Sequence, residues 1–110
     1  MKAHRQLSRM HIIQKGPAAI ALMIASEFGR AANRSEHRDN VLNCYRRARE
    51  LMGVLETVAL PLPVGRQLKP LYDRAAERHL LLEKHLTPDF VSKACAEFAD
   101  AFNRAAASLS

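Results

Sequence analysis

The chain has 110 residues, of which 48% are hydrophobic, and its seventeen Lys and Arg against eleven Asp and Glu give a formal net charge of +6. This length fits one domain with one core, and the apolar share excludes an intrinsically disordered chain. The basic balance favours an acidic partner, namely nucleic acid, an anionic membrane face or an acidic protein segment, but a simply solvated basic surface is the commoner case.

The composition predicts an all-α protein with a single domain over residues 1–110. Aromatic residues make up only 5% of the chain and Trp is absent, whereas Ala and Leu are abundant. Ala and Leu lose little conformational entropy in a helix, while strands favour β-branched and aromatic residues. We therefore expect helices as the main elements of the fold.

The first fifteen residues are open to two interpretations. An apolar stripe of Leu7, Met10 and Ile12 or Ile13 favours a short N-terminal helix, but the same segment fits a mobile tail. Its basic start is not followed by an apolar region long enough for a signal peptide. Nowhere does an apolar run approach the roughly 20 residues that span a bilayer, so we expect a cytoplasmic protein without a membrane span.

Two helices are expected in the first half of the chain. Gly16 and Pro17 form the first break, and residues 18–32 after it are apolar around most of the helical circumference, which is typical of a central helix. Residues 41–58 repeat apolar side chains at steps of three and four. This spacing predicts a helix with one buried stripe and a charged opposite face.

Two more helices are expected in the second half. A break at residues 61–65 contains two prolines, and apolar positions at helical spacing follow over residues 68–86. Pro70 either begins this helix in its first turn or kinks it. Thr87 and the proline after it form a helix start, and the last helix follows over residues 90–105. Four main helices with short loops predict an up-and-down bundle.

Recognisable catalytic and metal-binding patterns are absent from the sequence. There is no Gly-rich phosphate loop and no nucleophile motif, and His79 and His85 are spaced so that they point to different faces of a helix. Cys44 and Cys95 are too few and too far apart for a zinc site or a disulfide framework, and both fit small buried hydrophobes in a reducing compartment. We therefore predict no catalysis, no metal and no cofactor.

Three stretches carry a resemblance to a known family. Residues 17–24 form a proline followed by an apolar helix, and residues 45–55 form a basic-Ala-basic helix with an apolar ending. Leu71-Tyr72-Asp73 follows, and Arg78 comes shortly after it. With these stretches the chain resembles, over roughly residues 10–107, the FliS-type flagellar export chaperones.

The resemblance is incomplete at five places, one of which is the aromatic residue that follows the first core motif in the family and is replaced here by Ala25-Ser26. The stretch between Pro17 and Tyr45 is shorter than in the family, and the tyrosine-containing N-terminal cap segment is missing. Arg74 and Phe102 stand where a second Tyr and a Trp are usual. These departures leave room for a different client.

The resemblance implies a helical bundle that binds and sequesters a client protein and catalyses no reaction. FliS-type chaperones hold the disordered C-terminal segment of flagellin, which folds into helices as its apolar stripe covers an apolar groove. Carried over position by position, the implied partner-binding residues are Ile12, Ile13, Ile20, Met23, Ile24, Leu51, Leu55, Leu68, Leu71 and Tyr72. Each of them also fits ordinary bundle core, and for Leu51, Leu55 and Leu71 core is the favoured interpretation.

Two other functions stay open. A basic bundle that binds nucleic acid would use its arginines on phosphates, although acidic residues are interleaved with them and few aromatic residues are available for stacking. The stripe would consist of Arg34, Arg38, Arg46, Arg47 and Arg49. A structural subunit would instead pair its apolar helix with a second copy as a homodimer. The acidic side chains of the third long helix are expected to pair on the surface with its basic ones, namely Asp73, Glu77 and Glu83 with Arg74, Arg78 and Lys84.

Overall fold

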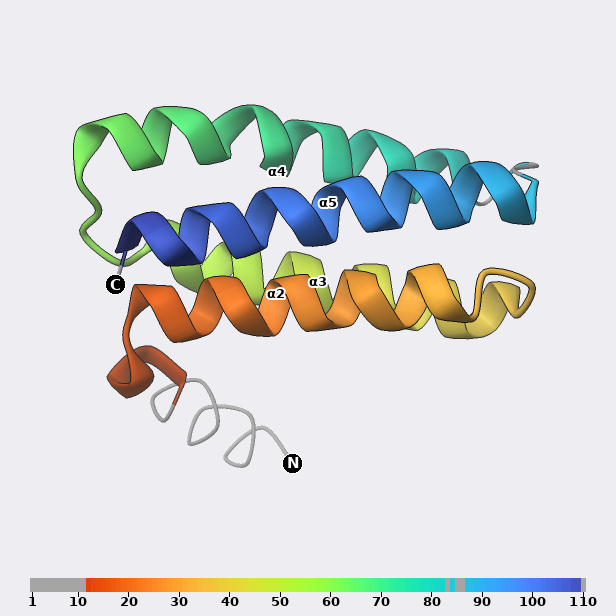
Figure 1. Ribbon diagram of the computed structural model, residues 1–110, viewed down its shortest axis with the longest axis horizontal. Helices are drawn as coiled ribbons and strands as arrows, with labels where there is room; N and C mark the ends of the chain where they lie inside the picture. The colour runs from red at the N-terminus through yellow and green to blue at the C-terminus, as the bar shows by residue number, and fades with distance from the viewer. Residues whose placement is uncertain (1–11, 83, 85–86, 110) are drawn as a thin grey trace.

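Four long helices make up most of the protein (Figure 1). The computed structural model describes residues 12–82, 84 and 87–109, and within these ranges every regular element is a helix. The helices are α2 (Pro17–Asn33), α3 (Arg38–Glu56), α4 (Leu62–Leu82) and α5 (Pro88–Leu109), and residues 12–15 form a helical turn before α2. This confirms the predicted all-α bundle with four main helices. Residues 1–11, including Leu7 and Met10 of the expected N-terminal stripe, lie outside the described residues.

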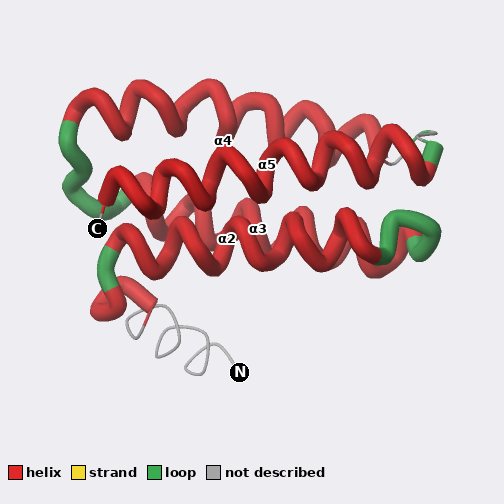
Figure 2. The backbone as a smooth tube through the Cα atoms, in the orientation of Figure 1, coloured by secondary structure: helices red, strands yellow, loops and turns green. Residues whose placement is uncertain are grey.

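The helices run up and down around one core. Figure 2 shows the α2–α3 loop at one end of the bundle and the α3–α4 loop at the opposite end, and both connections are short. α2 packs closely against α5 and α3, whereas α4 lies beside α3 and α5 at a greater backbone separation. In Figure 1, α4 forms one side of the bundle and α2 the other, with α5 between them on the near side. α4 is therefore the least closely packed of the four.

The start of α2 depends on Gly16. Its φ of +91° lies in a region that L side chains rarely adopt, so this turn requires glycine. The Gly16 N–H donates to the Ile13 carbonyl at 3.2 Å, and its own carbonyl accepts from Ile20 at 3.2 Å. Pro17 follows in the first turn, where its missing N–H leaves no bond unmade. The predicted break at this point is confirmed.

The starts of α4 and α5 differ in how well they were predicted. α4 begins at Leu62, inside the stretch expected to be a break, because Pro63 lies in the first turn, where helical N–H groups have no partner. Pro70 then lies inside α4 rather than at its start. At α5 the prediction is confirmed, since the Phe90 N–H donates to the Thr87 hydroxyl at 3.3 Å, the expected N-cap bond.

An aromatic cluster from α2, α3 and α5 occupies the middle of the core. Phe28 is fully buried and its ring centroid lies 4.8 Å from that of Phe98, 5.2 Å from that of Tyr45 and 6.0 Å from that of Phe102. Rings at these distances gain dispersion and quadrupole energy beyond their burial. From α4, Tyr72 reaches this cluster with its centroid 6.4 Å from that of Phe102, and His79 reaches it with its centroid 5.8 Å from that of Tyr45. The core is thus centred on three helices, and α4 covers it from outside.

Candidate partner-binding groove

Half of the residues implied as groove lining lie inside the bundle. Ile20, Ile24, Leu55 and Leu68 are fully buried and Leu51 is 8% exposed, all within one core cluster. Side chains in these positions hold the four helices together. In this closed bundle they do not present a surface to a partner.

The other five are nearer the surface but do not meet in one groove. Ile12, Met23, Leu71 and Tyr72 are partly buried and pack against the core cluster, and Ile13 is 42% exposed. Ile12 and Ile13 come from the turn before α2, Met23 from α2, and the last two from α4. One of the ten, Leu71, lines a hollow between α4 and α5.

That hollow lies between α4 and α5 and measures about 330 Å³. Its lining residues are Leu71, Arg74 and Arg78 from α4, and Ala94, Glu97, Phe98, Ala101 and Arg104 from α5. We call this surface the α4–α5 groove. It exists because α5 presents two alanines at a place where the backbone of α4 stands away from it.

The floor of the groove is apolar and its rim is charged. Leu71, Ala94, Phe98 and Ala101 are buried or half-buried, with Phe98 only 5% exposed. The rim holds three guanidinium groups against one carboxylate, and two of the three guanidinium groups extend from α4. Charges along a concave low-dielectric wall attract ions of opposite sign more strongly than the same charges on a flat surface. The groove is therefore suited to a ligand with an apolar side and negative edges.

The rim arginines are unpaired within the part of the chain that is described. Arg74, Arg78 and Arg104 form no ion pair with any described residue, and Arg78 instead lies over the Phe90 ring, 4.6 Å from its centroid. Asp73 and Glu77, expected as their partners on α4, form no ion pair with them, so that expectation was wrong for these two residues. Glu83, the third expected acidic partner, lies outside the described residues.

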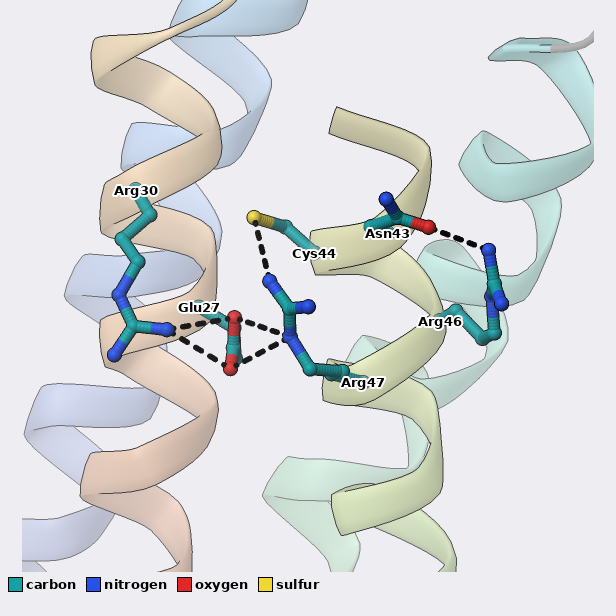
Figure 3. A network of polar contacts seen from close by, with 6 residues as sticks. All are labelled: Glu27, Arg30, Asn43, Cys44, Arg46 and Arg47. Atoms are coloured by element: carbon teal, nitrogen blue, oxygen red, sulfur yellow. Dashed lines mark hydrogen bonds and ion pairs between the residues drawn. The ribbon is translucent and has the colours of Figure 1, made fainter. Parts of the chain in front are cut away.

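The arginines of α3 are used differently, as Figure 3 shows. Arg47 donates from Nε to both carboxylate oxygens of Glu27 on α2 at 3.2 Å, and Arg30 donates to the same oxygens at 3.1 Å. Glu27 is only 8% exposed, and a buried carboxylate is costly unless it is paired. The two guanidinium groups compensate its charge at the contact between α2 and α3. The hydrogen bond to Glu27 raises the pKa of Arg47 above its usual value.

A second α3 arginine also joins two helices. Arg49 donates to Nδ1 of His79 on α4 at 2.9 Å, and the His79 ring stacks on Tyr45 with centroids 5.8 Å apart. Arg46 bonds to Asn43 one turn before it (Figure 3). Two arginines of the expected phosphate-binding stripe, Arg47 and Arg49, therefore hold the bundle together. They are not set out as a free row for nucleic acid.

A smaller hollow of about 240 Å³ lies at the end of the bundle where the α2–α3 and α4–α5 connections meet. Its described lining combines Ser35, Glu36, Arg38 and Lys84 with apolar side chains of α3, α4 and α5. Both signs of charge are present there. The residues next to it in the α4–α5 connection lie outside the described ranges.

Reactive groups in the described residues are few and buried. Cys44 and Cys95 are both free and buried, as predicted. Burial raises the pKa of Cys95 to about 11, and burial with the nearby Glu27 carboxylate raises the pKa of Cys44. Both thiols therefore stay protonated and weakly nucleophilic at neutral pH. Within the described ranges no three His, Cys, Asp or Glu side chains are placed to hold a metal ion, and no helix is long and apolar enough to cross a membrane.

Comparison with known proteins identifies no relative, because no family model, no curated protein and no solved structure matches this chain.

Sequence reasoning missed most of the groove. Arg74 and Arg78 were expected to form surface ion pairs with acidic side chains of the same helix. Ala94, Phe98 and Ala101 were expected to lie on the buried stripe of the last helix. A signal was nevertheless present, since Leu71, Arg74 and Arg78 are spaced by three and four and so share one face of α4. What the spacing could not show is that α5 turns small residues toward this face.

Proposed function

We propose that this protein is a non-catalytic binding protein that holds an amphipathic helical segment of a partner protein in the α4–α5 groove. The observation that supports this most directly is the hollow between α4 and α5, whose apolar lining consists of Leu71, Ala94, Phe98 and Ala101. A helix laid along such a floor buries its apolar stripe, as in other helix-in-groove complexes. Nothing in this function needs a reactive side chain.

The dimensions of the groove support a helix as the ligand. Its α5 wall runs from Ala94 to Arg104, which is about 15 Å along a helix, or roughly three turns. A partner segment of similar length would place apolar residues at i, i+3, i+4 and i+7 on the floor. A disordered segment would become ordered on binding, so the affinity per unit of buried area would be moderate.

The client we propose is the C-terminal segment of flagellin, held before export in the cytoplasm. This choice rests on the resemblance to the FliS-type export chaperones. Leu71, Tyr72 and Asp73, which carry part of that resemblance, are on the helix that forms one wall of the groove. We propose the outer α4–α5 surface as the place of the client, since half of the residues first implied by the resemblance are core.

Calorimetric titration of the purified protein with a flagellin C-terminal peptide tests this function. We expect binding with a negative heat-capacity change, because apolar surface is buried, and a large part of the affinity should remain at high salt. Ala101→Glu places a charge on the groove floor and should weaken binding by roughly a hundredfold. Ala96→Glu is the matched control, because Ala96 is exposed on α5 and does not line the groove.

The outcomes separate the parts of the proposal. Absence of peptide binding would refute flagellin as the client. Binding that both glutamate variants weaken equally would refute the groove as its site. A dimer that forms with increasing concentration and is disrupted by Ala101→Glu would show instead that a second copy occupies this surface.

A further inference from the structure

We propose that the segment bound in the α4–α5 groove is acidic, with carboxylates flanking its apolar stripe that are bound by Arg74, Arg78 and Arg104. This inference rests on the proposed function, because it concerns the charge of a segment that the groove must first be able to bind. The basic composition favours an acidic partner without saying where it binds, and the family resemblance gives no charge for the client. The three arginines that line the groove without an ion pair lead to the inference.

Six of the ten described arginines contrast in their contacts, and the other four, Arg34, Arg38, Arg46 and Arg66, form no ion pair with a described residue but do not line the α4–α5 groove. Arg30 and Arg47 are paired with Glu27, and Arg49 is bonded to His79. Arg74, Arg78 and Arg104 line the groove without a carboxylate partner among the described residues, although Glu77 lies three residues after Arg74, a spacing that allows an ion pair on one helix face. Side chains that could pair locally but instead line an apolar groove are available for a partner's carboxylates.

The arrangement of the three guanidinium groups fits both edges of a bound helix. Arg74 and Arg78 are one turn apart on the α4 wall, while Arg104 lies on the α5 wall. Because consecutive helices of an up-and-down bundle are antiparallel, Arg104 lies toward the Leu71 end of the groove and Arg78 toward the Ala94 end. Glu97 lies between them on the α5 wall and would repel an acidic residue there. The bound segment should therefore carry most of its carboxylates along the edge that faces α4.

Arginine is well suited to this position. Its planar guanidinium binds a carboxylate through two parallel hydrogen bonds and tolerates contact with apolar surface. Arg78 is already held at the mouth of the groove by the Phe90 ring, so it loses less side-chain freedom when it binds. Phe90 is itself 40% exposed at this site, which leaves room for a partner beside the stacked pair.

Nucleic acid would also bind arginine, but it fits this groove less well. Sequence-tolerant binding of single strands relies on exposed aromatic rings that stack on bases. The aromatic ring of the floor, Phe98, is only 5% exposed. Binding to duplex phosphates would make no use of a floor formed by Leu71 and alanines. An acidic amphipathic helix would place its apolar stripe on the floor and its carboxylates beside the arginines of the rim.

Three designed peptides test the inference. They share one apolar helical stripe and differ only in their flanking residues, which are Glu, Gln or Lys. With the wild-type protein at moderate salt we expect the Glu peptide to bind roughly tenfold more tightly than the Gln peptide, and the Lys peptide more weakly than both. The advantage of the Glu peptide should shrink as salt is added.

Two matched triple variants assign the effect to the rim. The groove variant combines Arg74→Gln, Arg78→Gln and Arg104→Gln, and should bind the Glu and Gln peptides equally. The control variant removes the same number of charges elsewhere, at exposed arginines that do not line the groove, through Arg34→Gln, Arg46→Gln and Arg66→Gln. It should keep the preference for the Glu peptide. Circular dichroism of both variants verifies that the helices are intact.

Each contrary result has a distinct meaning. Equal binding of all three peptides by the wild type would refute the acidic partner but leave helix binding in place. No binding of any peptide would overturn both proposals. Loss of the preference in the control variant alone would place the acidic site on another face. Tighter binding of a DNA oligonucleotide than of the Glu peptide, abolished in the groove variant, would assign the rim to nucleic acid.

Discussion

Helix α5 meets its two neighbours in opposite ways. Toward α2 it packs closely, with Phe28 against Phe98 and Phe102, and the Ser92 hydroxyl donates to the Ala32 carbonyl at 3.0 Å. We call this interface the α2–α5 seam. Toward α4 the same helix leaves a groove of about 330 Å³. One helix therefore supplies both the most closed and the most open interface in the described part of the bundle.

The contrast shows that small residues have no fixed effect on packing. Within the described bundle, α2 and α5 both bury several alanines, and their backbones approach each other closely. At the groove, the α4 residues that line the hollow with the alanines of α5 are Leu71, Arg74 and Arg78. An alanine closes an interface only where the opposing helix can approach it. Four predictions, from the largest expected effect to the smallest, test this difference.

Phe28→Ala should have the largest effect on the free energy of unfolding. The ring is fully buried between Tyr45, Phe98 and Phe102, so its removal leaves a cavity in the seam and should cost about 3 to 5 kcal/mol. Urea unfolding followed by circular dichroism measures this loss. Leu22→Ala, on the same helix but 50% exposed, is the control and should cost less than about 0.5 kcal/mol. Similar losses for both would contradict a closed seam.

Ala105→Leu and Ala101→Leu compare the seam side and the groove side of α5 directly. Ala105 is fully buried, so a larger side chain should overpack the core and cost about 1 to 3 kcal/mol. Ala101 lines the groove, where the same change has room and should alter stability by less than about 0.5 kcal/mol. Equal destabilisation in urea titrations would show that the groove is closed in solution.

Alkaline pH should destabilise the closely packed part of the bundle. In the fold, burial raises the pKa of Cys95 from 9.0 to about 11, so the folded state keeps a proton that the unfolded thiol loses. Stability is therefore intact below pH 9 and should fall between pH 9 and pH 11 by up to about 1.4 kcal/mol per pH unit. Cys95→Ala should show a shallower fall in unfolding measurements across this window. An unchanged slope would mean that the thiol is accessible in the folded protein.

Tyr72→Phe should have the smallest effect. The hydroxyl oxygen of Tyr72 on α4 is buried and has no hydrogen-bond partner among the described residues. Its removal should therefore be neutral or stabilise the fold by up to about 1 kcal/mol. Tyr45 is the control, because its hydroxyl accepts a hydrogen bond from Cys95 Sγ at 3.7 Å, and Tyr45→Phe should cost about 0.5 kcal/mol. A clear loss of stability in Tyr72→Phe would show that its hydroxyl is bonded in solution.

The sequence was sufficient for the fold because helical periodicity is a local signal. Steps of three and four located α3 and α5, and Thr87 with the proline after it located the start of α5. The start of α4 was misplaced because proline at a first turn and proline in a break look the same in a sequence. The buried state of the two cysteines was also predictable from their apolar surroundings.

The groove was harder to predict because it depends on how far apart two helices lie. The family resemblance, carried over position by position, implied Ile20, Ile24 and Leu55 as groove lining, but these side chains are fully buried in the core of this bundle. The pairing of Glu27 with Arg47 could not be predicted either, because the two residues are on different helices and the number of residues between them does not indicate a contact. Which arginines remain free becomes visible only once these contacts between helices are known.

Amide hydrogen exchange with and without the Glu-flanked peptide is the most direct test of the central claim, that the α4–α5 groove is the binding surface. Exchange reports local opening at each backbone amide, so it locates the site without relying on a mutation. We expect the peptide to slow exchange over residues 71–78 of α4 and 94–104 of α5, with little change in α2. Slowing along α2 or the outer face of α3, with none beside the groove, would contradict the claim and place the binding surface elsewhere.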